Sequence, residues 1–245
     1  YAQAGCLLEP YRIIRDSKLM IIAIDGPAGS GKSSVAKIIA NKLQFKHINT
    51  GAMYRAVALK ARQLNADLND EGKIADVALN QSIEFVPGDE GQAVVADGED
   101  VTALLRSKQV DQDAAIVASL GKVRDILVAK QRDMGKTGSI VMEGRDIGTV
   151  VFPRAQRKFF LDATPEVRGK RRCLELQAKN QEADVDAIIE QIRQRDEMDR
   201  NRKVSPLIRS EDAIYIDTTN FELEEVVNQI LGWIEQAPTQ IINRK

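Results

Sequence analysis

Apolar residues along this chain occur in two patterns, short continuous runs and helical spacing, and the two patterns alternate. Ile21–Ile24 is a run of four apolar residues, which is typical of a strand buried on both faces. Similar short runs predict further strands at Phe45–Asn49, Ser139–Met142, Lys158–Leu161 and Ala213–Ile216. Because strands that alternate with helices pair in parallel, we expect an α/β fold with a parallel sheet covered on both faces.

Helices are predicted between most of these strands. After the first strand, Val35, Ile38, Ile39 and Leu43 recur at helical spacing. Further helical segments are expected at about Ala52–Leu64, Gln109–Leu120, Val123–Met134 and from Ala187 into Arg193–Arg202.

Two local signals predict where helices begin. Thr164-Pro165 supplies a capping side chain followed by proline at the first helical position. Thr219-x-x-Glu222 fits a capping box, so we expect a closing helix that begins there and runs through Trp233.

The segment from about Ala66 to Val101 has a different pattern. Ile83 and Phe85 alternate with polar neighbours, and turns are predicted at 87–91 and at Asp97-Gly98. This pattern predicts a small antiparallel meander, which we interpret as an inserted subdomain.

Both ends of the chain fit this organisation poorly. Residues 1–19 precede the first strand without a clear pattern, and Met20 stands where a native start would be natural. Leu7-Leu8 is too short to be the apolar core of a signal peptide. We therefore interpret 1–19 as an extension, native or not, and 237–245 as a polar tail that frays.

Candidate chemistry begins directly after the first strand. Gly26 to Ser33 fits G-x-x-x-x-G-K-[ST], the phosphate-binding loop, and a predicted helix follows it as the motif requires. The backbone N–H groups of such a loop surround phosphates, and the helix N-terminus adds positive charge. We expect Lys32 to reach the β- and γ-phosphates of a nucleoside triphosphate, and Ser33 to bind Mg²⁺.

Composition excludes several other classes of protein. The formal net charge is −1, so no overall field attracts nucleic acid or a membrane surface, and aromatic residues make up only 4% of the chain. Cys6 and Cys173 form neither a disulfide framework nor a zinc pattern, which favours the reducing cytoplasm. No apolar run reaches membrane-spanning length. His47, the one histidine, is interpreted as structural.

Arginine is concentrated in two segments, Lys170–Arg172 and Arg193–Arg202. One interpretation is a solvated helix face stabilised by pairs such as Arg195 with Asp199. The alternative is a phosphate site, because phosphoryl transfer needs cations and arginine supplies planar bidentate donors. In a helix, Arg195, Asp199 and Arg202 share one face. Arg145-Asp146 follows a predicted parallel strand, where ligands of open α/β sheets bind.

Four motifs together resemble bacterial cytidylate kinases. They are Gly26–Lys32, Asn49–Arg55, Glu143–Pro153 and Arg195–Arg202, and the resemblance extends from about Met20 to Glu235. It implies transfer of the ATP γ-phosphoryl group to CMP or dCMP with Mg²⁺, in a cytoplasmic monomer that binds no nucleic acid or membrane.

The resemblance also implies an architecture. We expect the P-loop nucleoside monophosphate kinase fold, with a five-stranded parallel sheet, a small antiparallel β insert and a helical lid. The kinase domain would cover 20–236, with its core at 20–65 and 136–236, an inserted nucleotide-binding subdomain at about 66–135 and the lid at about 165–185.

Site roles follow from the same resemblance. The ATP-binding set is Gly26, Pro27, Ala28, Gly29, Ser30, Gly31, Lys32, Ser33 and Ser34. The acceptor-binding set is Thr50, Tyr54, Arg55, Arg124, Arg145, Asp146, Arg195, Asp199 and Arg202. Within it, Arg55, Arg145 and Arg202 match positions that hold the acceptor phosphate, Arg195 and Asp199 the sugar, and Arg124 and Asp146 the cytosine edge. Lys32, Arg145, Arg195 and Arg202 are the expected catalytic residues, and Arg171 and Arg172 are expected on the lid.

One departure affects the expected specificity. Ala115 stands where the family has a serine, so the base site lacks a hydroxyl and selection of cytosine over uracil could be weaker. Ser119, one helical turn later, is a possible substitute.

Two other functions remain as alternatives. A kinase for another small acceptor would keep the loop but lack the Arg195–Arg202 motif, and a GTPase switch would carry an Asn-Lys-x-Asp tetrapeptide, which this sequence lacks.

Overall fold

The structure is a computed structural model that describes residues 19–88, 91–178 and 182–236. The predictions made for 1–18 and for the tail 237–245 lie outside these residues, as does a small part, 179–181, of the expected lid. None of the helices in the described part of the chain is long and apolar enough to cross a membrane.

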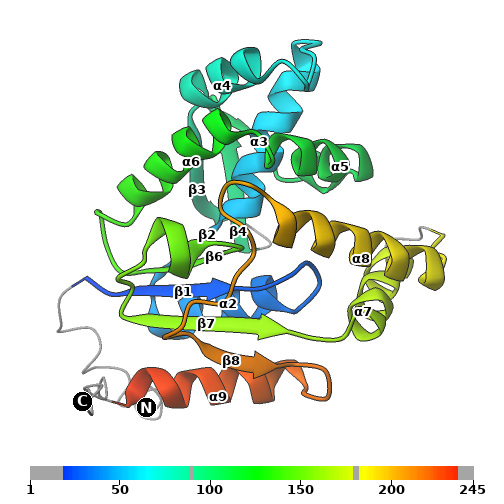
Figure 1. The fold of residues 1–245 in the computed structure, drawn as a ribbon. Helices are drawn as coiled ribbons and strands as arrows, with labels where there is room; N and C mark the ends of the chain where they lie inside the picture. The colour runs from blue at the N-terminus through cyan, green and yellow to red at the C-terminus, as the bar shows by residue number, and fades with distance from the viewer. Residues whose placement is uncertain (1–18, 89–90, 179–181, 237–245) are drawn as a thin grey trace, which may run out of the picture.

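Five parallel strands in the described residues form the central sheet (Figure 1). Their order is β2 (Lys46–Asn49), β6 (Ile140–Gly144), β1 (Ile21–Asp25), β7 (Arg157–Asp162) and β8 (Ile214–Asp217). All five predicted strands are confirmed, with ends shifted by one or two residues. β1 is central, which explains why its apolar run shows no alternation with polar residues.

Helices cover both faces of this sheet, as predicted. Ile22 and Ile24 point to one face, where α2 (Lys32–Leu43) and the closing helix α9 (Leu223–Glu235) pack. Ala23 points to the opposite face, toward α6 (Gly121–Met134) and the short π-helical turn η2 (Ile147–Val151).

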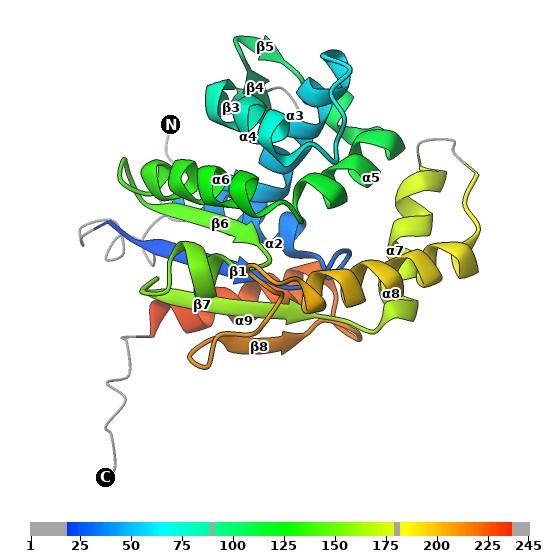
Figure 2. The same cartoon turned by 45° about the horizontal axis from the view of Figure 1, so that its top comes forward.

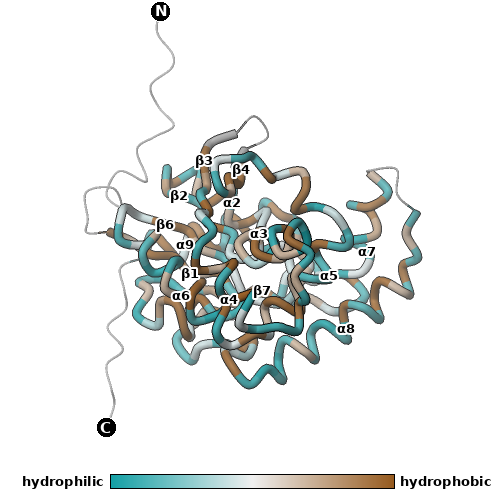
Figure 3. Tube along the Cα trace, turned by 90° about the horizontal axis from the view of Figure 1, so that it is seen from above, coloured by the Kyte–Doolittle hydropathy of each residue, from teal (hydrophilic) through white to brown (hydrophobic). Residues whose placement is uncertain are grey.

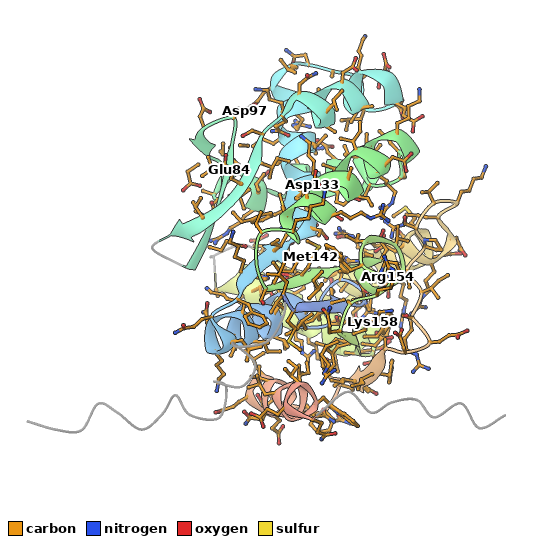
Figure 4. The ribbon with its side chains drawn as sticks, turned by 90° about the vertical axis from the view of Figure 1, so that its left-hand side faces the viewer. Glu84, Asp97, Asp133, Met142, Arg154 and Lys158 are labelled. Atoms are coloured by element: carbon orange, nitrogen blue, oxygen red, sulfur yellow. The ribbon has the colours of Figure 1, made fainter. Side chains whose placement is uncertain are left out.

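A second body lies above the sheet, built around its own apolar core (Figures 1 and 2). It contains α3 (Thr50–Gln63), α4 (Glu71–Asn80), η1 (Leu104–Arg106), α5 (Lys108–Val117) and α6. An antiparallel sheet of β3 (Ile83–Gly88), β4 (Gly91–Ala96) and β5 (Glu99–Asp100) covers one side, which confirms the predicted β insert. Figure 4 shows Glu84 and Asp97 on this insert, away from Met142 in the central sheet.

Two long helices form an arm beside the carboxyl ends of the strands. α7 (Pro165–Gln177) and α8 (Val185–Asn201) pack through Cys173, Ile188 and Ile192. The hydropathy view shows α8 as mostly hydrophilic with short hydrophobic stretches (Figure 3). Thr164 accepts a hydrogen bond from the Val167 N–H, so the predicted start of α7 is confirmed.

Two sequence predictions need correction. The segment predicted as a pure meander also contains α4, whose buried Ile74, Ala75 and Ala78 form a short apolar face. The capping box predicted at Thr219 and Glu222 is wrong by three residues. In the structure Glu222 is the capping residue of α9, and it forms the capping box with Glu225. The Thr219 hydroxyl instead accepts a hydrogen bond from the Thr164 N–H, a contact between distant segments.

Candidate active site

The loop after β1 has the backbone that a phosphate-binding loop requires. Gly26, Gly29 and Gly31 have φ values of 146°, 77° and 87°. A Cβ at Gly26 would lie 1.9 Å from the Leu161 carbonyl oxygen on β7, so no other residue fits there. The backbone of the loop therefore lies directly against β7 at Gly26 before the chain enters α2.

Lys32 is held inside this loop. Its Nζ donates to the Pro27 carbonyl at 2.5 Å and lies 3.3 Å from the Ser30 hydroxyl. Burial lowers the pKa of Lys32 to about 7, and the positive charge of Arg145 adds to the effect. A bound polyphosphate would place negative charge beside the ammonium group of Lys32 and so favour its charged form.

Asp25, the last residue of β1, fixes the position of the neighbouring turn. Its two carboxylate oxygens accept hydrogen bonds from the Ile147 and Gly148 N–H groups at 2.8 and 2.7 Å. Burial raises the pKa of Asp25 to about 6, although these hydrogen bonds oppose the rise. The sequence analysis had assigned this residue no role.

Ser33 and Glu143 bring two hard oxygen ligands together. The Ser33 hydroxyl donates to Glu143 Oε2 at 2.7 Å, and His47 Nε2 lies 3.1 Å from Oε1. Burial alone would raise the pKa of Glu143, but His47, Lys32 and Ser33 together lower it. A hydroxyl and a carboxylate suit Mg²⁺, which takes one or two protein ligands and fills its remaining positions with water and phosphate.

No group of three or more His, Cys, Asp or Glu side chains that could hold a metal by themselves occurs in residues 19–88, 91–178 and 182–236. The Ser33 hydroxyl and the Glu143 carboxylate are two neighbouring oxygen groups of the kind that Mg²⁺ prefers. His47 contacts Glu143, and its structural interpretation stays a prediction.

Three of the predicted acceptor residues form one cluster. Arg145 Nε donates to Asp199 Oδ2 at 2.8 Å, and Arg202 Nη1 lies 3.5 Å from Asp199 Oδ1. Within the described residues, Arg202 Nε and Nη2 are buried and have no hydrogen-bond partner. Burial lowers the pKa of Arg202, with Asp199 opposing this effect. The cluster thus holds buried donors that an anionic ligand could satisfy.

A second cluster joins Arg124 of α6 to Asp146. Arg124 Nη2 donates to Asp146 Oδ2 at 2.5 Å, while Nη1 donates to the Ala118 carbonyl at 3.0 Å. The guanidinium carbon lies 5.4 Å from the centre of the Tyr54 ring. Burial raises the pKa of Tyr54 to about 12, so its hydroxyl keeps its proton at neutral pH.

A third cluster spans the upper body and the arm. Arg55 of α3 and Arg195 of α8 both contact Asp111 of α5, a residue that the sequence analysis did not single out. The expected pair of Arg195 with Asp199 is replaced by these contacts. The interpretation of this segment as a helix face stabilised by that pair is therefore wrong.

The remaining predicted residues lie around these clusters. The Thr50 hydroxyl donates to the Glu143 carbonyl at 2.8 Å, next to the acceptor arginines, and Ser34 is exposed in the first turn of α2. Ala115 is half-buried on α5, whereas Ser119 is exposed in the turn after this helix, and its hydroxyl donates to the Ile116 carbonyl.

The two expected lid arginines point in different directions. Arg171 donates to the Thr218 hydroxyl and carbonyl, and the Thr218 hydroxyl contacts the Ser30 carbonyl of the loop. Arg172 pairs with Glu175 on the surface of α7. Only Arg171 is thus connected with the phosphate-binding loop by hydrogen bonds.

Arg168 is the connection that sequence reasoning missed. It is 1% exposed, and its guanidinium donates to the Ala163 and Ala28 carbonyls and to both oxygens of Asp196. These bonds tie the phosphate-binding loop to α7 and α8. The one feature of the local sequence that could have indicated Arg168 is its position in the first turns of a well-capped helix.

A family model and individual relatives that match this chain carry the same description. A family model described as cytidylate kinase matches residues 22–236. The cytidylate kinase of Desulforamulus reducens is 46% identical over 216 residues, covering 88% of this chain and 97% of that protein. The cytidylate kinase of Bacillus subtilis is 45% identical over 219 residues, covering 89% and 98%. Among solved structures, shikimate kinase from Bacteroides thetaiotaomicron gives a TM-score of 0.44 at 15% identity, covering 89% and 100%.

Proposed function

Because the chain belongs to the cytidylate kinase family, an ATP-dependent group of enzymes that phosphorylate CMP and dCMP, we propose that the clusters around its phosphate-binding loop carry this transfer. One observation supports the assignment most strongly. Buried N–H groups of Arg55 and Arg202 have no partner among the described residues, beside a loop shaped for phosphates. Buried donors of this kind are costly unless a ligand satisfies them.

The loop side binds the donor, ATP. Lys32 and the loop N–H groups hold the β- and γ-phosphates, with Gly26–Ser34 surrounding them. Ser33 and Glu143 hold Mg²⁺ together with the nucleotide. When bound, the metal neutralises charge on the phosphate oxygens. Glu143 adds a carboxylate to the single metal-binding residue expected from the sequence.

The arginine side binds the acceptor. Arg55, Arg145 and Arg202, with Thr50, hold the acceptor phosphate for transfer of the γ-phosphoryl group. Arg195, which pairs with Asp111 here, and Asp199, which contacts Arg145 and Arg202, hold the sugar. Arg124, Asp146 and Tyr54 form the site for the base, where Arg124 and Asp146 fix one another's orientation.

The chemistry requires no strong base. The attacking phosphate oxygen is already anionic at neutral pH, so the residues act by positioning and by neutralising charge. Lys32, Arg145, Arg195 and Arg202 carry most of this role. Closure of the expected lid, at about 165–185, would exclude water and suppress hydrolysis of ATP.

A coupled assay of ADP release tests the proposal. ATP with Mg²⁺ is supplied with CMP, dCMP, UMP, AMP or shikimate, and we expect strong turnover with CMP and dCMP. Turnover with shikimate instead would assign the site to another small acceptor. If no acceptor raised ADP release above the background, the proposed phosphoryl transfer to an acceptor would be wrong.

The proposal includes a monomer that acts in the cytoplasm. Among the described residues, Cys173 is a buried free thiol, which is compatible with a reducing compartment. Size-exclusion chromatography with light scattering would test the oligomeric state.

A further inference from the structure

Asp111 links two arginines that belong to different parts of the proposed acceptor site. Arg195 Nη1 donates to Asp111 Oδ2 at 3.0 Å, and Arg55 Nη1 lies 3.8 Å from Asp111 Oδ1. Each carboxylate oxygen therefore faces a different guanidinium group. The contacts connect α3 and α5 of the upper body with α8 of the arm, and Figures 1 and 2 show α5 above α8.

This arrangement resembles the way an arginine pair binds a phosphate. Guanidinium groups bind carboxylates and phosphates through the same planar N–H donors, so one anion can replace the other. Burial would raise the pKa of Asp111, but Arg195, Arg55 and the more distant Arg172 lower it below its usual value. The side chain is thus an anion at neutral pH, in contact with cations that the acceptor also needs.

We propose that Asp111 is an internal counter-ion, which pairs with Arg55 and Arg195 in the free enzyme and which the acceptor phosphate displaces. The inference rests on the proposed function, because Arg55 must contact the acceptor. A phosphate dianion and a carboxylate repel each other when they share one guanidinium group. The binding of CMP therefore includes the work of breaking the contact between Asp111 and Arg55.

The structure allows this displacement. The Asp111 side chain is 31% exposed, so it can rotate toward water without opening the core. Its contact with Arg55 is the longer of the two and is the first to be lost. The expected consequence is weaker binding of CMP, and also of stray anions such as inorganic phosphate, than the arginines alone would give.

Asp113 provides a matched control on the same helix. It lies two residues from Asp111 and pairs with Arg62 at 2.8 Å and with Gln109 at 3.0 Å, outside the proposed acceptor site. Replacing either aspartate with asparagine removes one negative charge from α5. Only Asp111→Asn releases arginines of the acceptor site.

The test measures the KM for CMP, kcat and inhibition by inorganic phosphate in the wild type, Asp111→Asn and Asp113→Asn. We expect Asp111→Asn to lower the KM for CMP about two- to fivefold, in line with a partly exposed ion pair. Phosphate should inhibit this variant more strongly by a similar factor, with kcat within about twofold of the wild type. Asp113→Asn should change none of these values. An unchanged or higher KM for CMP in Asp111→Asn would overturn the inference.

Two further variants keep the result interpretable. Asp111→Ser, which also removes the charge, replaces Asp111→Asn if thermal unfolding shows that the latter is poorly folded. Arg55→Gln tests the premise separately, because it should raise the KM for CMP. If Arg55→Gln has no effect, the acceptor does not contact Arg55 and the site assignment is wrong. If it raises the KM while Asp111→Asn does not lower it, only the counter-ion inference is wrong.

Discussion

Arg168 and Arg202 show how differently the two sides of the site use an arginine. Arg168, beside the phosphate-binding loop, is 1% exposed, and carbonyl and carboxylate oxygens accept hydrogen bonds from its Nε, Nη1 and Nη2. Arg202, on the acceptor side, contacts Asp199 at 3.5 Å, and within the described residues two of its buried nitrogen atoms have no partner. The first arginine is a structural component of the fold, and the second is available for a ligand.

The same difference distinguishes the whole loop side of the site from the whole acceptor side. On the loop side, Asp25, Arg168 and Thr218 hold the backbone in place through hydrogen bonds within the chain. On the acceptor side, Asp199 and Asp111 each serve two arginines. A prearranged loop suits a donor that always presents the same phosphates, whereas loosely paired arginines can be taken over by an incoming anion.

Replacing Arg168 should give the largest loss of stability. Arg168→Ala leaves Asp196 as a buried carboxylate without its partner, and breaking a buried pair in this way lowers the unfolding free energy by about 3–5 kcal/mol. Denaturant unfolding followed by circular dichroism measures the loss. Arg193→Ala removes an exposed pair with Glu166 and serves as the control, with an expected change within about 0.5 kcal/mol. Equal stabilities of the two variants would contradict the structural role of Arg168.

Replacing Arg202 should affect catalysis and leave stability almost unchanged. In Arg202→Ala, kcat/KM for CMP should fall about 100-fold, because one charged donor to the acceptor phosphate is lost. Steady-state kinetics with varied CMP measures this, together with a thermal melt. Arg200→Ala, an exposed change in the last turn of α8, two residues before Arg202, should retain normal kinetics. Unchanged turnover of Arg202→Ala at both limiting and saturating CMP would remove the phosphate-binding role.

Asp25 should make the stability of the loop side depend on pH. Burial raises its pKa from 3.8 to about 6, so the folded state holds this proton more tightly than the unfolded state does. The resulting stabilisation is complete below about pH 4 and is lost as the pH rises through 6, by about 2–3 kcal/mol in total. We compare the unfolding free energies of the wild type and Asp25→Asn from pH 4 to 7.

As the pH rises from 4 to 7, the unfolding free energy of Asp25→Asn should increase relative to that of the wild type. The variant also loses an acceptor for one of the two N–H groups, but that loss does not depend on pH. A constant difference across the range would mean that Asp25 ionises normally in the folded protein.

The smallest effect is expected at Ala115. Ala115→Ser restores a hydroxyl on α5, and one neutral hydrogen bond to the base should raise the preference for CMP over UMP about two- to tenfold. The measurement is the ratio of the two kcat/KM values. Ser119→Ala is the control, since the Ser119 hydroxyl is exposed and donates to the Ile116 carbonyl at the end of α5. A ratio that is the same with and without the serine would show that position 115 does not contact the base.

Short sequence patterns, each spanning a few residues, were sufficient to predict much of the fold. The apolar run of β1, the glycines of the following loop and the Thr164-Pro165 start of α7 were all predicted from local sequence. These features depend on backbone geometry and on burial of a strand from both sides, which nearby residues determine. Short motifs also predicted site residues such as Lys32 and Arg145, whereas Arg168, which donates to the loop carbonyl of Ala28, was missed.

Tertiary structure decided which charged groups meet. Arg168 and Asp196 are 28 residues apart, and Asp111 and Arg195 are 84 apart, so no spacing rule connects them. An ion pair depends on how α5, α7 and α8 pack, and packing alone determines whether an arginine is satisfied by the chain or left for a substrate. The sequence by itself therefore determined the phosphate-binding loop and the family. The packed structure decided which arginines are paired within the chain and which keep buried N–H groups without a partner among the described residues.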